Sequence, residues 1–189
     1  MFNNKYGLTR AVLEGRKTQT RRIAYIGNIS NLDCGICVER KNFGRATLFY
    51  GIVNIAHSRY CVGEEVAVAQ AYCELVSKVV FNESEINKLR NSKGWTNKMF
   101  VKADLMPHRI RITDIRAERL QDISEEDCLA EGIVDFESRI NKAHFYSITD
   151  ESATYGTAQK PYSLLIDKIA GKGTWASNPY VFVYEFELI

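Results

Sequence analysis

Alternating apolar and polar positions predict strands along the chain, most clearly near its C-terminal end. Every second residue from Tyr180 to Leu188 is large and apolar, which predicts a strand over 179–188. The same two-residue period predicts a strand over 108–113, with Ile110 and Ile112 facing inward. Three further segments have strand-like sequences: 20–26, 98–102 and 63–72, the last as a buried central strand.

Apolar residues at helical spacing predict short helices with recognisable ends. One helix is expected over 5–14 and ends at Gly15, where a left-handed C-terminal cap fits. Ser124 is positioned to cap a second helix that ends at Gly132, and Asp127 completes a variant of the capping box. The remaining helices are expected at 83–90 and between Pro161 and Gly171.

The order of these elements favours one fold class. Strands outnumber helices, and the helices are short and irregularly placed, so we expect an α+β fold on a mixed, curled sheet rather than a doubly wound one. A chain of 189 residues suits a single domain over 1–189, with elaborations at about 27–60 and 135–160. Within the first, 47–56 fits either a strand or a helix, and the second is expected to be a long loop.

Composition narrows the functional classes only a little. The chain is 46% apolar and 25% charged, which is ordinary for a globular protein. A formal net charge of +2 is too small for a polycation, so nucleic-acid binding would have to come from local clusters of Lys and Arg. There is neither a secretory apolar region nor a run near the roughly 20 apolar residues that cross a bilayer. We therefore expect a cytoplasmic protein without a membrane partner.

The five cysteines fit reduced thiols rather than structural disulfides. Cys34 and Cys37 form a CxxC that resembles half of a zinc site, but a second tight pair of ligands is missing, so neither a metal nor another cofactor is expected. The chain also has no phosphate-binding glycine loop, which argues against an NTPase and a Rossmann dehydrogenase.

The most informative chemistry lies in 14–22, where the first helix gives way to a strand. This segment gathers four cations and two hydroxyls: Arg16, Lys17, Arg21, Arg22, Thr18 and Thr20. If Lys17 is partly desolvated near other cations, its pKa falls and it becomes a candidate base for the Thr20 hydroxyl. The alternative is that these cations are solvated surface charges, and spacing alone does not decide.

Two further sets of residues are candidates for the same site. Glu131 ends the helix that Ser124 begins, where the helix dipole disfavours a carboxylate unless a cation such as Lys17 or Arg22 is near. The alternative is an exposed glutamate at a helix end. Tyr72 and Trp175 are candidate stacking surfaces for a base, although most aromatic residues of the chain are expected in its core.

These residues resemble a known family. Gly15, Lys17 and Arg22 match the signature Gly-x-Lys-x-x-Glu-x-Arg of ASCH-domain proteins, and Thr20 occupies its glutamate position. Three more segments resemble the family in the same order, at 63–72, 116–133 and 175–186. The chain is thus similar to the ASCH branch of the PUA-like superfamily, to its phage and prophage members, and to bacterial N4-acetylcytidine amidohydrolases.

The resemblance implies a PUA-like, partly open β-barrel with short flanking helices and a cleft lined by the signature. In the amidohydrolase branch a threonine nucleophile, an activating lysine and a glutamate form the catalytic set, which falls on Thr20, Lys17 and Glu131. Gln70 departs from the glutamate that phage-type relatives commonly carry, which puts a role for a charge at that position in doubt.

Three functions remain open at this point. The leading one is an RNA- or nucleotide-binding protein whose cationic cleft needs only the cations and aromatic partners. Its expected ligand contacts are Arg16, Lys17, Arg21, Arg22, Gln70, Tyr72 and Asn178. The second is an amidohydrolase acting on an N-acylated nucleoside or similar small molecule. The third is a nuclease or a non-enzymatic accessory protein of a phage or mobile element.

Overall fold

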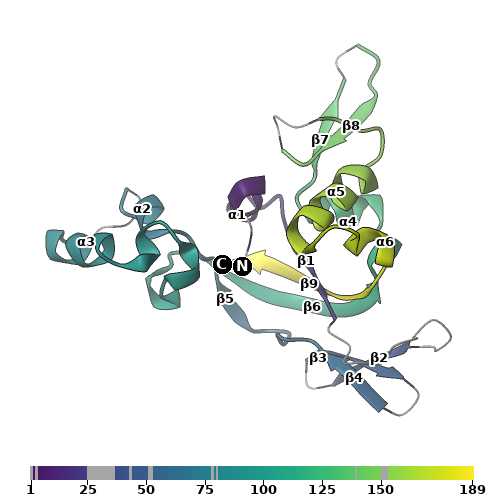
Figure 1. Ribbon diagram of the computed structural model, residues 1–189, viewed down its shortest axis with the longest axis horizontal. Coiled ribbons are helices and arrows are strands. Elements are labelled where there is room, and N and C mark those ends of the chain that lie inside the picture. The colour runs from purple at the N-terminus through teal and green to yellow at the C-terminus, as the bar shows by residue number, and fades with distance from the viewer. Residues whose placement is uncertain are drawn as a thin grey trace.

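A curled, four-stranded antiparallel sheet with the order β1-β9-β6-β5 forms the centre of the computed structural model, in the shape of half a barrel (Figure 1). Its strands are β1 (Gln19–Ile23), β5 (Glu65–Ala67), β6 (Arg109–Arg119) and β9 (Tyr180–Leu188). The structure describes residues 2, 4–24, 37–42, 44–50, 53–77, 79, 81–138, 140–149 and 153–189. The α+β class is confirmed, but every strand pairing in these residues is antiparallel, so the expected mixed sheet is wrong.

Two smaller sheets account for the elaborations. One is a three-stranded sheet of β2 (Cys37–Asn42), β3 (Arg45–Tyr50) and β4 (Val53–His57). The other is a hairpin of β7 (Val134–Glu137) and β8 (His144–Ser147). Residues 47–50 and 53–56 are therefore strand rather than helix, and the expected long loop over 135–160 begins with a hairpin. The predicted turn at 27–28 and Cys34 lie outside the described residues.

Short helices surround the central sheet. They are α1 (Leu8–Leu13), α2 (Tyr72–Leu75), α3 (Glu83–Arg90), α4 (Glu125–Ala130), α5 (Gln159–Ala170) and α6 (Thr174–Ser177), with 3-10 turns at Asn4–Tyr6, Lys93–Trp95, Lys98–Phe100, Ala103–Leu105 and Leu120–Asp122. In Figure 1, α4, α5 and α6 gather over one part of the sheet, and α2 and α3 extend from it as a helical arm. No helix in the described ranges is both long and apolar enough to span a membrane.

The strand with the clearest alternation lies inside the sheet. β9 pairs with β1 on one side and with β6 on the other, and its residues 181–184 are all buried. Phe182 and Tyr184 contribute to the main core, as do Ile110 and Ile112 of β6, which confirms their inward direction. The second face of β9, which carries Val181 and Val183, is therefore buried as well as the aromatic face. The alternation alone did not indicate this, because it predicts only one buried face.

Two predicted strands differ from the structure. The segment 63–72 is not a central strand, because only Glu65–Ala67 forms a strand, and it lies at the edge of the sheet, before the chain leaves for the helical arm. The segment 98–102 is not a strand either, since Lys98–Phe100 forms a 3-10 turn. The arm has its own small core around Tyr72, Leu75 and Met106, and Val101 packs against it. The ends of both predicted strands therefore belong to the arm and not to the sheet.

The signals at the ends of α1 and α4 are confirmed except for the capping box at Asp127, and they position the site. At the end of α1, the amide of Gly15 donates to the Val12 carbonyl (3.0 Å) and that of Arg16 donates to the Ala11 carbonyl (2.9 Å). This Schellman pattern needs the left-handed backbone of Gly15 (φ 73°). At the start of α4, Ser124 Oγ accepts from the Asp127 amide at 3.1 Å. The Asp127 side chain does not complete a capping box, because arginines bind it.

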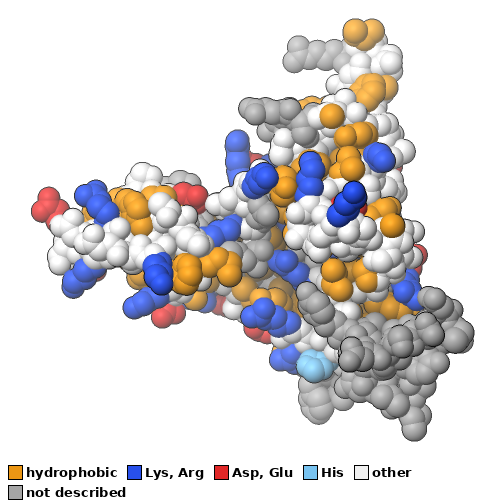
Figure 2. All heavy atoms as spheres, viewed as in Figure 1, with side chains coloured by type: hydrophobic (Ala, Val, Ile, Leu, Met, Phe, Trp, Pro, Cys, Tyr) orange, Lys and Arg blue, Asp and Glu red, His pale blue; other side chains and the backbone are white. Residues whose placement is uncertain are grey.

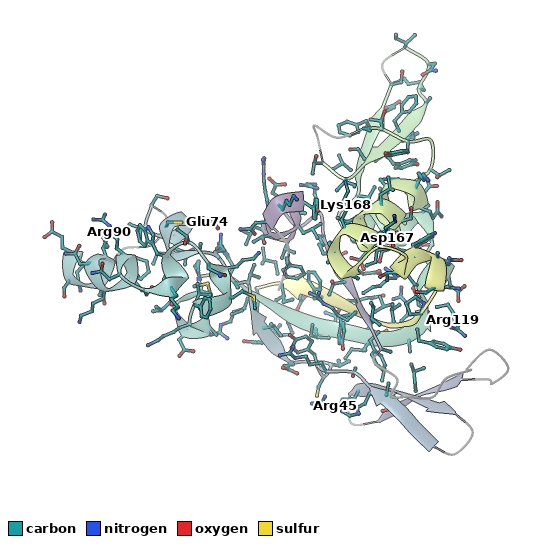
Figure 3. The ribbon with its side chains drawn as sticks, in the orientation of Figure 1. Arg45, Glu74, Arg90, Arg119, Asp167 and Lys168 are labelled. Carbon is teal, nitrogen blue, oxygen red and sulfur yellow. The ribbon has the colours of Figure 1, made fainter. Side chains whose placement is uncertain are left out.

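The helices over the sheet are tied to one another by a polar contact. Asp167 of α5 accepts hydrogen bonds from the amides of Gly173 (3.2 Å) and Trp175 (2.8 Å), which fixes the start of α6 (Figure 3). The Trp175 ring then packs edge-on against Tyr162, with 6.1 Å between the ring centroids. Tyr162 is thereby held beneath α6, on the face of α5 that turns toward the sheet.

Candidate active site

A buried lysine and a buried glutamate meet where α1 and α4 end. Lys17 Nζ donates to Glu131 Oε2 at 2.5 Å and to the Glu131 carbonyl at 2.7 Å. The two residues are only 2% and 6% exposed. Burial lowers the pKa of the Lys17 ammonium below its ordinary value of 10.5, and the Glu131 carboxylate offsets this only in part. The predicted partnership of Lys17 and Glu131 is therefore present in the geometry.

The backbone explains why these residues meet. The amide of Thr18 donates to the carbonyl of Ala130 (2.9 Å), which joins the segment after α1 to the end of α4. Gly132 has a left-handed φ of 101°, and a Cβ at this position would lie 3.5 Å from the Lys17 Cβ. That distance is an ordinary van der Waals contact, so glycine is favoured here by its left-handed backbone, which turns the chain after Glu131.

Arg21 belongs to a dense network of ion pairs beside this contact. It is 4% exposed, and its guanidinium binds Glu118 (2.7 Å), Asp127 (2.5 Å) and Glu131 (3.4 Å). Burial opposes the charge, but the neighbouring carboxylates outweigh it and raise the pKa of Arg21. Arg116 shares two of these carboxylates, Asp127 and Glu118, and it also binds Glu185. The predicted phosphate contact at Arg21 does not fit this arrangement, because carboxylates already occupy its donors.

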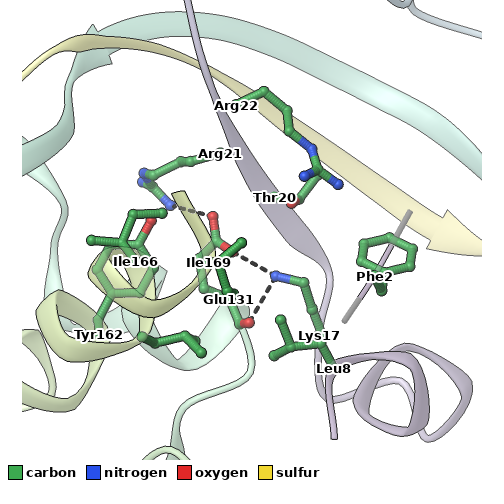
Figure 4. Close-up of a pocket in the computed structure, with 11 residues that line it drawn as sticks. Phe2, Leu8, Lys17, Thr20, Arg21, Arg22, Glu131, Tyr162, Ile166 and Ile169 are labelled. Atoms are coloured by element: carbon green, nitrogen blue, oxygen red, sulfur yellow. Dashed lines mark hydrogen bonds and ion pairs between the residues drawn. The ribbon is translucent and has the colours of Figure 1, made fainter. Parts of the chain in front are cut away.

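Thr20 and Arg22 lie on the face of β1 opposite Arg21, and both line two small cavities, the first of which is drawn in Figure 4. The first, of about 50 Å³, is lined by apolar residues and by six polar ones: Lys17, Thr20, Arg21, Arg22, Glu131 and Tyr162. The second, of about 40 Å³, is mainly apolar and shares Thr20 and Arg22 with the first. Its other lining residues are Phe2, Tyr60, Val66, Ala67, Ala69, Ile110, Ile112 and Tyr184. No hydrogen bond joins Lys17 to Thr20 among the described residues, although they line one cavity.

The other predicted ligand contacts lie elsewhere. Arg16 is exposed and pairs with Glu14 at 2.8 Å. The Tyr72 hydroxyl accepts from the Lys102 amide (2.8 Å) inside the helical arm. Asn178 adopts a left-handed turn and its Oδ1 accepts from the Gln121 amide (2.8 Å). The structure brings none of the three to the Lys17 cavity.

Gln70 and the cysteines add no further chemistry to the site. Gln70 is 3% exposed, and its backbone amide donates to the Met106 sulfur (3.3 Å). Its side-chain oxygen has no hydrogen-bond partner within the described ranges. Cys61, Cys73 and Cys128 are free thiols. The described residues hold no group of three or more His, Cys, Asp or Glu side chains that would bind a metal ion.

Sequence reasoning missed Glu118, Arg116 and Tyr162. Glu118 and Arg116 continue β6 beyond the strand predicted at 108–113, so their position beside Arg21 depends on the register of the whole sheet. Tyr162 stands at helical spacing with Leu165 and Ile166, which indicates an inward face. That spacing does not identify the cavity which the face lines.

No protein-family model, curated protein or solved structure matches this chain.

Proposed function

We propose that the cavity of Lys17, Thr20 and Glu131 hydrolyses the amide bond of an acylated amine, such as an N-acylated nucleoside. The observation that carries the proposal is the buried contact of Lys17 with Glu131 in a cavity that the Thr20 hydroxyl also lines. A buried lysine with a lowered pKa beside a hydroxyl is a common way to activate a weak nucleophile.

The bonding of Lys17 suits a base. A neutral amine has two N–H bonds, and Lys17 donates two hydrogen bonds to Glu131, so its lone pair is available for a proton. In the proposed reaction, Thr20 Oγ bonds to the carbonyl carbon and passes its proton to Lys17. Lys17 then protonates the departing nitrogen as the C–N bond breaks. Water hydrolyses the resulting ester, which releases the acid and restores the Thr20 hydroxyl.

The dimensions of the cavities restrict the substrate. Volumes of about 50 and 40 Å³ admit a small acyl or amide group but are too small to enclose a nucleoside. The reacting amide would therefore enter beside Thr20 while the rest of the molecule stays outside. Arg22 lines both cavities, so it is the cation we assign to the charge that develops on the carbonyl oxygen.

A substrate panel tests this function. Purified protein is incubated with N-acylated nucleosides and simple N-acyl amines of increasing acyl length, and mass spectrometry follows the freed amine. We expect release to be fastest for the shortest acyl groups, because the cavities are small. The absence of freed amine from every member of the panel would contradict the proposal.

Nucleic-acid binding is a second candidate, and a separate hollow favours it. Lys5, Arg10 and Arg16 line a space of about 280 Å³ beside α1, and Glu14 supplies a carboxylate next to the two arginines. The cations beside Thr20, in contrast, face the carboxylates of Glu118, Asp127 and Glu131. On the face in Figure 2, Lys and Arg are scattered among apolar groups rather than gathered in one patch.

Charge reversal in this hollow tests the second candidate. Arg10→Glu is expected to weaken binding of a short fluorescent RNA and to reduce the salt slope of the affinity by about one, as loss of a phosphate contact does. Lys88→Glu on α3, also an exposed cation, is the matched control and should bind as the wild type does. Equal anisotropy curves for both variants would exclude the hollow, and no binding by the wild type would exclude the function.

A further inference from the structure

One buried hydroxyl in the cavity has no hydrogen-bond partner. Tyr162 of α5 is 1% exposed, and its Oη forms no hydrogen bond with any residue that the structure describes. Buried hydroxyl groups in proteins almost always have a partner, so an exception indicates a water molecule, a ligand or strain. The Tyr162 ring is held by Trp175 at 6.1 Å between centroids, which keeps the hydroxyl where it is.

The surroundings of this hydroxyl explain why no protein group satisfies it. Glu131 is occupied by Lys17 and Arg21, and Arg21 is also bound to Glu118 and Asp127. Burial and then the Glu131 carboxylate raise the pKa of Tyr162 well above 10, with Cys128 and Glu118 acting in the same direction and Arg21 against it. The phenol therefore keeps its proton at neutral pH and is available as a donor.

We propose that Tyr162 Oη is a binding group for a neutral hydrogen-bond acceptor, such as the carbonyl oxygen of an amide, in the cavity it shares with Thr20. A neutral acceptor is favoured because Lys17 and Arg21, which also line this cavity, already bind carboxylates, and an anion would lose its hydration on entering. The inference rests on the proposed function only where it identifies the acceptor as the carbonyl oxygen of the substrate amide. In either case, Tyr162 is the residue that selects neutral ligands over anionic ones.

Thermal shifts with two small probes test the inference without requiring turnover. Acetamide and acetate have similar size, but only acetamide is neutral at pH 7. Acetamide is expected to raise the Tm of the wild type, and acetate is not. Tyr162→Phe removes only the hydroxyl, so its Tm without ligand should equal or exceed that of the wild type, and acetamide should no longer raise it.

Tyr72→Phe is the matched control, because Tyr72 is also a buried tyrosine but its hydroxyl accepts from the Lys102 amide (2.8 Å). It should lower the Tm and leave the response to acetamide unchanged. The inference is overturned if acetamide has no effect on the wild type, if acetate has the same effect, or if Tyr162→Phe responds as the wild type does. A lower Tm for Tyr162→Phe would mean that the hydroxyl has a structural partner.

If the substrate panel gives an active amide, the same variants separate the two proposals. Loss of the Tyr162 hydroxyl should raise KM about tenfold, as expected for one hydrogen bond to a substrate. An unchanged KM with normal turnover would exclude the role of Tyr162 and leave the hydrolase intact. No turnover by the wild type, with the acetamide effect present, would exclude the hydrolase and leave the binding group.

Discussion

Replacing Arg21 with methionine is expected to lower the free energy of unfolding by roughly 3–5 kcal/mol, as loss of one partner from a buried ion pair does. Arg21 is 4% exposed and binds the carboxylates of Glu118, Asp127 and Glu131. Methionine fills part of the space but leaves buried carboxylates without a main counter-charge. Urea denaturation measures the change, and acid should partly relieve it, because protonation removes the uncompensated charges.

Arg111→Met is the matched control for this substitution. Arg111 binds two carboxylates, those of Glu65 and Glu187, at 3.1 and 3.2 Å, where Arg21 binds three. Its side chain is 44% exposed, however, so water takes the place of the lost arginine and screens both partners. Little change in stability is expected. Equal destabilisation by the two substitutions would contradict the account of the Arg21 network, in which the burial of the ion pairs makes the loss of the arginine costly.

Replacing Lys17 with methionine is expected to reduce kcat/KM for the amide substrate about a thousandfold or more, because the Thr20 proton loses its acceptor. The fold should persist, since Arg21 still faces Glu131. In the wild type, kcat/KM should increase with pH and level off below pH 10.5. The reason is that only neutral Lys17 accepts a proton and burial lowers its pKa below that value.

Lys168→Met is the control, because Lys168 is an exposed lysine of α5. It should retain both the rate and the pH profile of the wild type. A wild-type rate that falls with pH between 7 and 10, or a Lys17→Met variant with the same pH profile as the wild type, would exclude Lys17 as the base.

The sequence predicted the parts of the site that depend on local signals. Gly15 and Gly132 mark the ends of α1 and α4 correctly. Lys17 and Glu131 lie beside these two helix ends, where they meet. The β-branched and alternating stretches also placed β1, β6 and β9. Such signals act over a few residues, so they do not depend on the arrangement of the sheet.

The rest of the site depends on contacts that are distant in sequence. Arg21 and Arg22 are neighbours in the chain, but they point to opposite faces of β1, and only the register of β1, β9 and β6 places carboxylates around Arg21. The predicted cationic cleft is consequently largely neutralised. In the same way, the segment 63–72 alternates like a central strand, but only Glu65–Ala67 forms one, at the edge of the sheet, and Tyr72 packs in the separate core of the helical arm.

The rate of amine release by Thr20→Val, on the most active substrate of the panel, tests the central claim most directly. Valine keeps the shape of threonine and removes the hydroxyl. Thr18→Val, at an exposed position two residues earlier, is the control. Amine release is expected to fall to the uncatalysed rate in Thr20→Val and to stay at the wild-type rate in Thr18→Val. Amine release by Thr20→Val at the wild-type rate would contradict the assignment of Thr20 as the nucleophile.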